Sequence, residues 1–95
     1  MAVTKLSDSD VQQKLEGLTG WTLDQGKLHK TFIFDNFVGA FGFMAKVALV
    51  AESANHHPEW FNVYNRVVVH LATHDVDGIS DKDFDLAAEM DRLGR

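Results

Sequence analysis

The sequence predicts an α+β domain in which three helices lie on one face of a four-stranded antiparallel sheet, in the order α-β-β-α-β-β-α. Segments with alternating apolar residues occur in two pairs, each joined by only two residues, Gln25-Gly26 and Asn65-Arg66, which is typical of antiparallel hairpins. Segments with helical spacing precede, separate and follow these pairs, and helices collect on one side of the sheet in folds of this class. The length of 95 residues fits one domain, residues 1–95.

The first helix and the first hairpin follow from local patterns. Ser7 and Asp10 have the spacing of a capping box, and the apolar residues after them recur at helical spacing, so a helix is predicted at about residues 8–18. Residues 21–24 and 27–34 are predicted to be two strands joined by a tight turn. The second segment is rich in β-branched and aromatic residues, and its apolar residues Leu28, Phe32 and Phe34 alternate so that they share one face.

The most apolar segment is predicted to form a helix at residues 37–54, capped by Asp35 or Asn36. With 100° of rotation per residue, its apolar side chains cover an arc of about 260°. One sheet cannot cover so wide an arc, so we expect a homodimer or homotetramer formed through this helix. The alternative is a central helix enclosed within one domain, which so short a chain hardly permits. Glu52 lies inside the arc, where an ionised carboxylate needs a partner or water.

The second hairpin and the last helix are predicted by the same signals. Residues 60–64 and 67–73 read as strands, and Ser80 with Asp83 repeats the capping-box spacing before a C-terminal helix. The sheet face away from the helices should be open. We expect the tryptophan and tyrosine of this hairpin to lie there among the histidines, where a flat, partly polar ligand would fit.

Composition excludes several classes of function. Nine Lys and Arg residues against 14 Asp and Glu give a net charge of −5, and the scattered basic residues argue against direct nucleic-acid binding. The absence of cysteine excludes disulfides, thiolate metal sites and cysteine nucleophiles. The longest apolar run, residues 37–51, contains Lys46 and is shorter than the roughly 20 residues of a membrane span. With no signal peptide in residues 1–10, we expect a cytoplasmic protein without a membrane partner, and nuclear residence stays open.

Histidines are the residues best suited to chemistry in this chain. His56 and His57 follow the predicted central helix, and His74 ends a strand of the next hairpin, so the three are expected to meet at one rim of the sheet. Imidazole transfers protons near neutral pH because its ordinary pKa is about 6.5. His70 and His74 have a zinc-like spacing, but in a strand they are about 13 Å apart, so they cannot share one ion. We predict that the chain binds no metal. A site in which His56, His57 and His74 are the ligands is the remaining alternative. His29 is predicted to be an exposed residue.

The spacing of these residues resembles a known family signature. Glu52 is followed after three residues by His56-His57-Pro58, then by Tyr64, His74 and Asp83 at defined intervals. This pattern, together with the block from His56 to Asn65, resembles the pterin-4a-carbinolamine dehydratases over essentially the whole chain.

The resemblance implies a hydro-lyase that dehydrates 4a-hydroxytetrahydropterin to quinonoid dihydropterin, so that the pterin cofactor of aromatic amino acid hydroxylases is recycled. It implies that His56, His57 and His74 are catalytic and that no cofactor is needed, because the pterin is the substrate. Which histidine is the acid and which the base stays open. The residues implied to contact or border the pterin are Glu52, Asn55, His56, His57, Trp60, Tyr64, Ala72, Thr73, His74, Asp75 and Asp83.

The resemblance also implies roles for two carboxylates and two kinds of protein partner, a second copy of the chain and a transcription factor. Glu52 and Asp83 match carboxylate positions of the family and are expected to orient a histidine, while Asp83 has an equally weighted role in capping the last helix. Family members form dimers and tetramers, in agreement with the two-sided apolar helix. Some animal members bind a homeodomain transcription factor, so a coactivator with a transcription-factor partner is the alternative function.

Overall fold

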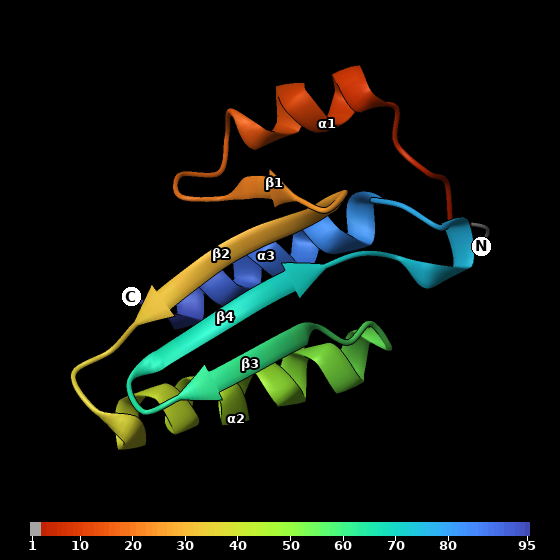
Figure 1. Cartoon of the computed structure of the whole chain (residues 1–95). Helices are drawn as coiled ribbons and strands as arrows, with labels where there is room; N and C mark the ends of the chain where they lie inside the picture. Colours follow the sequence, from red (N-terminus) through yellow and green to blue (C-terminus); the bar gives the residue numbers. More distant parts are fainter. Residues whose placement is uncertain (1–2) are drawn as a thin grey trace.

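The computed structural model describes residues 3–95 and has the predicted α-β-β-α-β-β-α order, with one additional short 3₁₀ helix (Figure 1). The fold class predicted from the sequence is therefore confirmed. The elements in chain order are α1 (Asp8–Leu15), β1 (Thr22–Asp24), β2 (Lys27–Ile33), α2 (Phe37–Ala54), β3 (Glu59–Val63), β4 (Arg66–Leu71), η1 (His74–Val76) and α3 (Asp81–Leu93).

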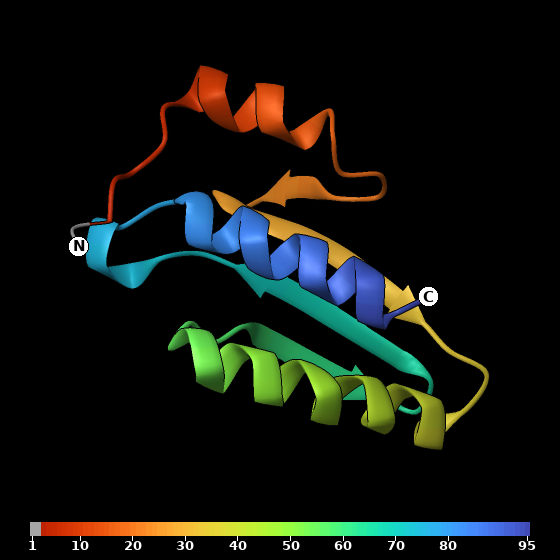
Figure 2. The same cartoon turned by 180° about the vertical axis from the view of Figure 1, so that it is seen from behind.

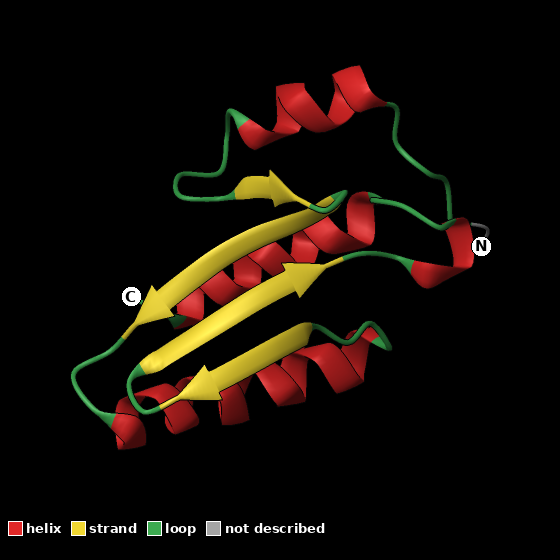
Figure 3. Ribbon diagram, viewed as in Figure 1, coloured by secondary structure: helices red, strands yellow, loops and turns green. Residues whose placement is uncertain are grey.

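The four strands form one antiparallel sheet in the order β1-β2-β4-β3 (Figure 3). The β1–β2 turn is formed by Gln25 and Gly26, both with positive φ, which matches the twist of a two-residue hairpin. The β3–β4 turn lies at Tyr64-Asn65, one residue earlier than predicted, so Tyr64 is a turn residue with φ of 49° and not a strand residue. The side chain of Asn65 fixes this position by donating to the carbonyl of Phe34 at 3.0 Å.

The helices enclose the core on one side of the sheet. Figure 2 shows α2 and α3 against one face, with α1 beyond the β1 edge beside the start of α3. Apolar side chains of all three helices join one cluster with β2 and β4, to which α1 contributes Val11. The first helix ends at Leu15 and not at residue 18, because Glu16, Gly17 and Leu18 donate to carbonyls three residues back and form tight turns.

The helix α2 has the predicted bounds and two apolar sides. Asn36 caps its start through a 2.8 Å bond from the backbone N–H of Gly39, and Asn55, in the left-handed conformation, ends it. Its inner side is buried against α3 and the sheet. Its outer side, which we call the α2 outer face, is exposed in the single chain and consists of Phe37, Val38, Phe41, Ala45, Ala48 and Leu49. By length and composition alone, α2 also meets the criteria of a membrane span. Of this helical segment, 22% is buried inside the fold.

Candidate active site

A pocket of about 400 Å³ lies at one rim of the sheet, where the end of α2 and the start of β3 meet the end of β4 and η1. His56, His57 and His74 all line it, so the expected convergence of the three histidines is present in the structure. The other lining residues are Asn55, Pro58, Glu59, Ala72, Thr73, Asp75 and Lys82.

His56 is the most buried of the three histidines, and a buried carboxylate holds it. Its Nε2 lies 2.6 Å from Oδ1 of Asp83, which is fully buried. The other carboxylate oxygen accepts from the hydroxyl of Thr73 at 2.8 Å and from the backbone N–H of Ser80 at 3.0 Å. Because a carboxylate can only accept, Nε2 of His56 carries the proton of this bond, and a neutral ring then has its lone pair on Nδ1.

Asp83 makes both of the contacts expected of it, with a histidine and at the start of α3, but it is fully buried and does not line the pocket. It forms a capping box with Ser80 at the start of α3, and it is the hydrogen-bond partner of His56. The Ser80 and Thr73 hydroxyl groups are themselves 2.6 Å apart, so the network is continuous. Among the described residues, no buried side-chain nitrogen or oxygen atom lacks a hydrogen-bond partner. The network therefore links the His56 ring to α3 through Asp83 and to the segment between β4 and η1 through Thr73.

His57 is held differently, by an exposed carboxylate. Asn55 reverses the chain after α2, and His57 then folds back so that its Nε2 lies 2.8 Å from Oε1 of Glu52. The side chains of both residues are more than half exposed, so the pair adds little stability and can rearrange easily. Glu52 itself does not line the pocket, but it contacts His57, which does.

His74 contacts a carboxylate that is shared with a lysine. Its Nε2 lies 3.2 Å from Oε2 of Glu59, while Oε1 of Glu59 accepts from Nζ of Lys27 at 2.6 Å. The hydrogen bond from Lys27 is the main cause that holds the pKa of Glu59 below its usual value of 4.5. Partial burial opposes this shift, and the charges of Lys27, His74 and His70 lower the pKa further by smaller amounts. Each of the three histidines therefore has its own carboxylate partner.

Changing Lys27 to methionine is expected to raise the pKa of Glu59 toward 4.5, because the hydrogen bond that lowers it is lost. Since the folded-state pKa is depressed, the ion pair contributes stability above the unfolded-state pKa, and this is lost as the pH falls through the folded-state pKa. Urea unfolding should therefore show a difference between wild type and variant that is constant at neutral pH and shrinks in acid below pH 4.5. Carbon NMR titration of Glu59 checks the shift, and an unchanged midpoint would contradict it. Glu89, which pairs with Arg92, is the internal control.

Comparisons with known proteins identify the family of this chain. The family model described as pterin 4 alpha carbinolamine dehydratase matches residues 4–93. The chain belongs to this family. A relative from Solibacter usitatus, provisionally named a pterin-4-alpha-carbinolamine dehydratase, is 56% identical over 90 residues, which cover 95% of each chain. A relative from Rhizobium rhizogenes with the same provisional name is 50% identical over 94 residues, covering 97% of this chain and 93% of the relative.

A solved structure of the pterin dehydratase family has nearly the same fold. The crystal structure of a Brucella melitensis protein, described as a transcriptional coactivator/pterin dehydratase, superposes with a TM-score of 0.93. It is 42% identical in sequence and covers 97% of this chain and 100% of its own. The similarity therefore extends over the whole domain, including the elements that build the pocket.

Some residues that the pterin dehydratase resemblance implied lie elsewhere. Trp60 pairs with the buried Val69 in register, so it faces the helices and packs against the core, and the expectation that it lies on the open sheet face is wrong. Tyr64 lies in the β3–β4 turn, at the opposite end of β3 from Glu59. Neither residue lines the pocket of the single chain, and their contact with pterin stays a prediction.

Three pocket residues were missed by the sequence analysis: Pro58, Glu59 and Lys82. Pro58 and Glu59 directly follow the two histidines, so their position in the chain was a usable signal. Lys82, in the first turn of α3, had no such signal. Lys27 was also missed, because it is 32 residues from Glu59 and only the pairing of the strands brings the two together.

Proposed function

We propose that the protein dehydrates 4a-hydroxytetrahydropterin to quinonoid dihydropterin and water. The observation that carries the proposal is that His56, His57 and His74 line one pocket together and that each of them contacts a carboxylate. Membership of the pterin-4a-carbinolamine dehydratase family and the names of its relatives support the choice of substrate. The reaction would return the pterin to the cycle that serves aromatic amino acid hydroxylases.

The chemistry requires one acid and one base. The bond between C4a and its hydroxyl group breaks, and an acid supplies the proton with which the hydroxyl leaves as water. A base removes a proton from a ring N–H, so the substrate loses one water and the enzyme ends with the same number of protons. Imidazoles suit both tasks near neutral pH, and no metal or organic cofactor is required.

The three histidines differ in how freely they can move protons. Nε2 of His56 is committed to the buried Asp83, so this ring can exchange a proton with substrate only through Nδ1. His57 and His74 are largely exposed and bound to the accessible carboxylates of Glu52 and Glu59. We propose that His56 is the rigid member of the set and that the two exposed imidazoles adjust to the substrate as it binds.

The direct test is a stopped-flow assay with chemically generated carbinolamine. The wild-type protein is expected to accelerate the loss of the carbinolamine over the spontaneous reaction in proportion to protein concentration. Quinonoid dihydropterin should form at the same rate, measured by its absorbance. A rate equal to the spontaneous background at every protein concentration would refute the proposed activity.

We further propose that the chain forms a homo-oligomer through the α2 outer face. This face exposes Val38 at 79% and Leu49 at 75% in the single chain, and large apolar patches of this kind mark interaction surfaces. A second copy of the same helix would cover them symmetrically.

Changing Leu49 to glutamate should dissociate the oligomer, because the carboxylate would be buried at the interface without a partner. Sedimentation is expected to show a species larger than 10.6 kDa for the wild type and a 10.6 kDa monomer for the variant. Lys46→Gln, on the polar side of α2, is the matched control and should sediment as the wild type. A wild type that sediments as a strict monomer at micromolar concentration would defeat the proposal.

The second candidate function is a protein-binding coactivator, favoured by the same exposed face and by the description of the Brucella melitensis relative. The two functions are separable in the Leu49→Glu variant. If the primary role is coactivation, the variant loses binding to a transcription-factor partner while dehydration by the folded chain continues. If the face serves only self-association, no such partner is bound by either form.

A further inference from the structure

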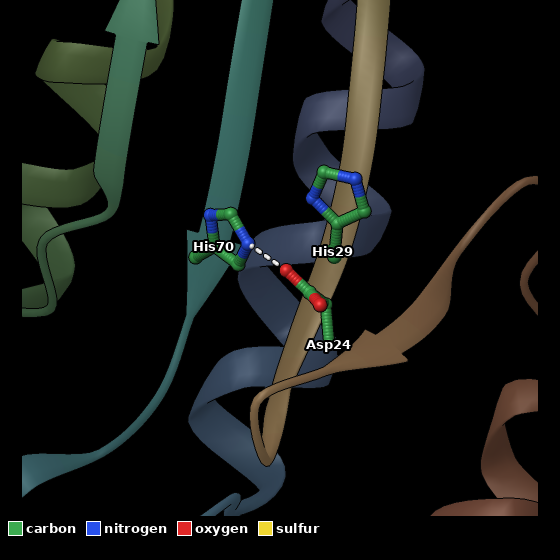
Figure 4. Close-up of side chains that lie close together, drawn as sticks. All are labelled: Asp24, His29 and His70. Carbon is green, nitrogen blue, oxygen red and sulfur yellow. Dashed lines mark hydrogen bonds and ion pairs between the residues drawn. The ribbon is translucent and has the colours of Figure 1, made fainter.

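A second cluster of histidines lies outside the pocket, on the sheet face away from the helices. It consists of Asp24 on β1, His29 on β2 and His70 on β4 (Figure 4). The register explains the convergence, because His29 lies opposite His70 on one side and opposite Thr22, two residues before Asp24, on the other. Three neighbouring strands therefore place these side chains on one face. None of the three lines the pocket around His56.

The geometry of the cluster is close to that of a metal centre. One ligand atom from each residue lies within 4.8 Å of the other two, and Nε2 of His70 is 2.8 Å from Oδ2 of Asp24. The rings of His29 and His70 stack with their centroids 4.5 Å apart. Ligands at zinc bond lengths of about 2.0–2.2 Å lie roughly 3.3 Å from one another in a tetrahedron, so small side-chain rotations suffice to close the site.

The donor atoms also select a class of ion. Two imidazoles and one carboxylate are the ligands that zinc and neighbouring first-row divalent ions take, with open positions left for water. Hard cations such as Mg²⁺ and Ca²⁺ prefer sites made of oxygen atoms alone. His29 Nδ1 now lies 3.1 Å from the carbonyl of Val69, so coordination through Nε2 would keep this contact and coordination through Nδ1 would replace it.

The charges around the cluster permit a cation. Lys27 lies opposite Asp24 in register, but its ammonium group is bound to Glu59 at 2.6 Å. Glu59 in turn lies opposite His70 on β3. The Lys27–Glu59 pair is neutral in sum, so the carboxylate of Asp24 sets the local charge, and a divalent ion is attracted to the face.

We propose that Asp24, His29 and His70 bind one divalent transition-metal ion of the zinc class, which joins β1 to β4 across β2. The site lies outside the catalytic pocket and takes no part in dehydration. Its effect is structural, because β1 is a three-residue edge strand and the ion would tie it to the centre of the sheet. Binding to the folded chain alone raises its stability by mass action.

The test is a titration of the metal-free chain with zinc chloride, followed by calorimetry and by the thermal unfolding midpoint. Wild type is expected to bind roughly one Zn²⁺ per chain and to unfold at a higher temperature with zinc present. The His29→Ala/His70→Ala double variant and the milder Asp24→Asn and His70→Gln variants should lose both responses. His74→Ala is the matched control, because it removes a pocket histidine, and it should keep both.

Folding of each variant is checked by circular dichroism in zinc-free buffer, so a loss of binding is separated from a loss of structure. If the double variant does not fold, the Asp24→Asn and His70→Gln variants, which keep side-chain size, decide the result. Zinc binding that is unchanged in the Asp24 and His70 variants, or that is lost in His74→Ala, would overturn the proposal. So would the absence of zinc binding to the wild type.

Discussion

Alanine at His56, His57 or His74 is expected to slow the dehydration of the carbinolamine by about 100-fold or more, because loss of one general acid or base has this effect. The stopped-flow assay measures the loss against the spontaneous background. The reduction should appear mainly in kcat, since proton transfer occurs in the transition state and not on binding. Gln13→Ala, an exposed change on α1, is the control and should keep the wild-type rate.

The three alanine variants should separate catalysis from folding. His57 and His74 are exposed, so their replacement is expected to change the free energy of unfolding by no more than about 0.5 kcal/mol while the rate falls. His56 is the partner of the fully buried Asp83, and its replacement should lower both the rate and the stability. Wild-type rates in the His57 and His74 variants would show that the acid–base assignment is wrong.

Changing Asp83 to alanine is expected to destabilise the chain by about 3 kcal/mol or more, because buried donors lose their common acceptor. The donors are the His56 ring, the Thr73 hydroxyl and the Ser80 N–H, within 2.6–3.0 Å of its oxygens. Urea unfolding measures the effect. Asp81→Ala is the matched control, because this aspartate is exposed and forms only a surface pair, so its change should stay within about 0.5 kcal/mol. Equal losses in the two variants would contradict the role of the network.

Asp83→Asn tests whether the same residue positions His56. The amide oxygen can still accept from Thr73 and Ser80, but the amide nitrogen is a donor and then faces Nε2 of His56. The ring must carry its proton on the other nitrogen to form this bond. We expect a marked fall in kcat with a smaller loss of stability than in Asp83→Ala. A wild-type rate in the asparagine variant would show that the tautomer of His56 does not matter.

Local sequence patterns were sufficient to predict the bounds of an element when the residues that set those bounds lie within or next to that element. The bounds of α2 were predicted correctly because a cap residue and a long apolar pattern specify them together. The β3–β4 turn was predicted one residue late, because a period of two identifies a strand but not the residue at which it turns. The side chain of Asn65, bonded to the distant Phe34, sets that position.

The sequence by itself determined the element order, the proximity of His56 to His57 and the family signature, because these depend on residues close together in the chain. Some histidines contact a carboxylate that is far away in the sequence, and for these the tertiary structure decided the partner. Asp83 reaches His56 across 27 residues, and Asp24 reaches His70 across 46. These contacts depend on strand register and on the packing of α3. Both are set by the burial of the whole apolar core, which no local pattern encodes.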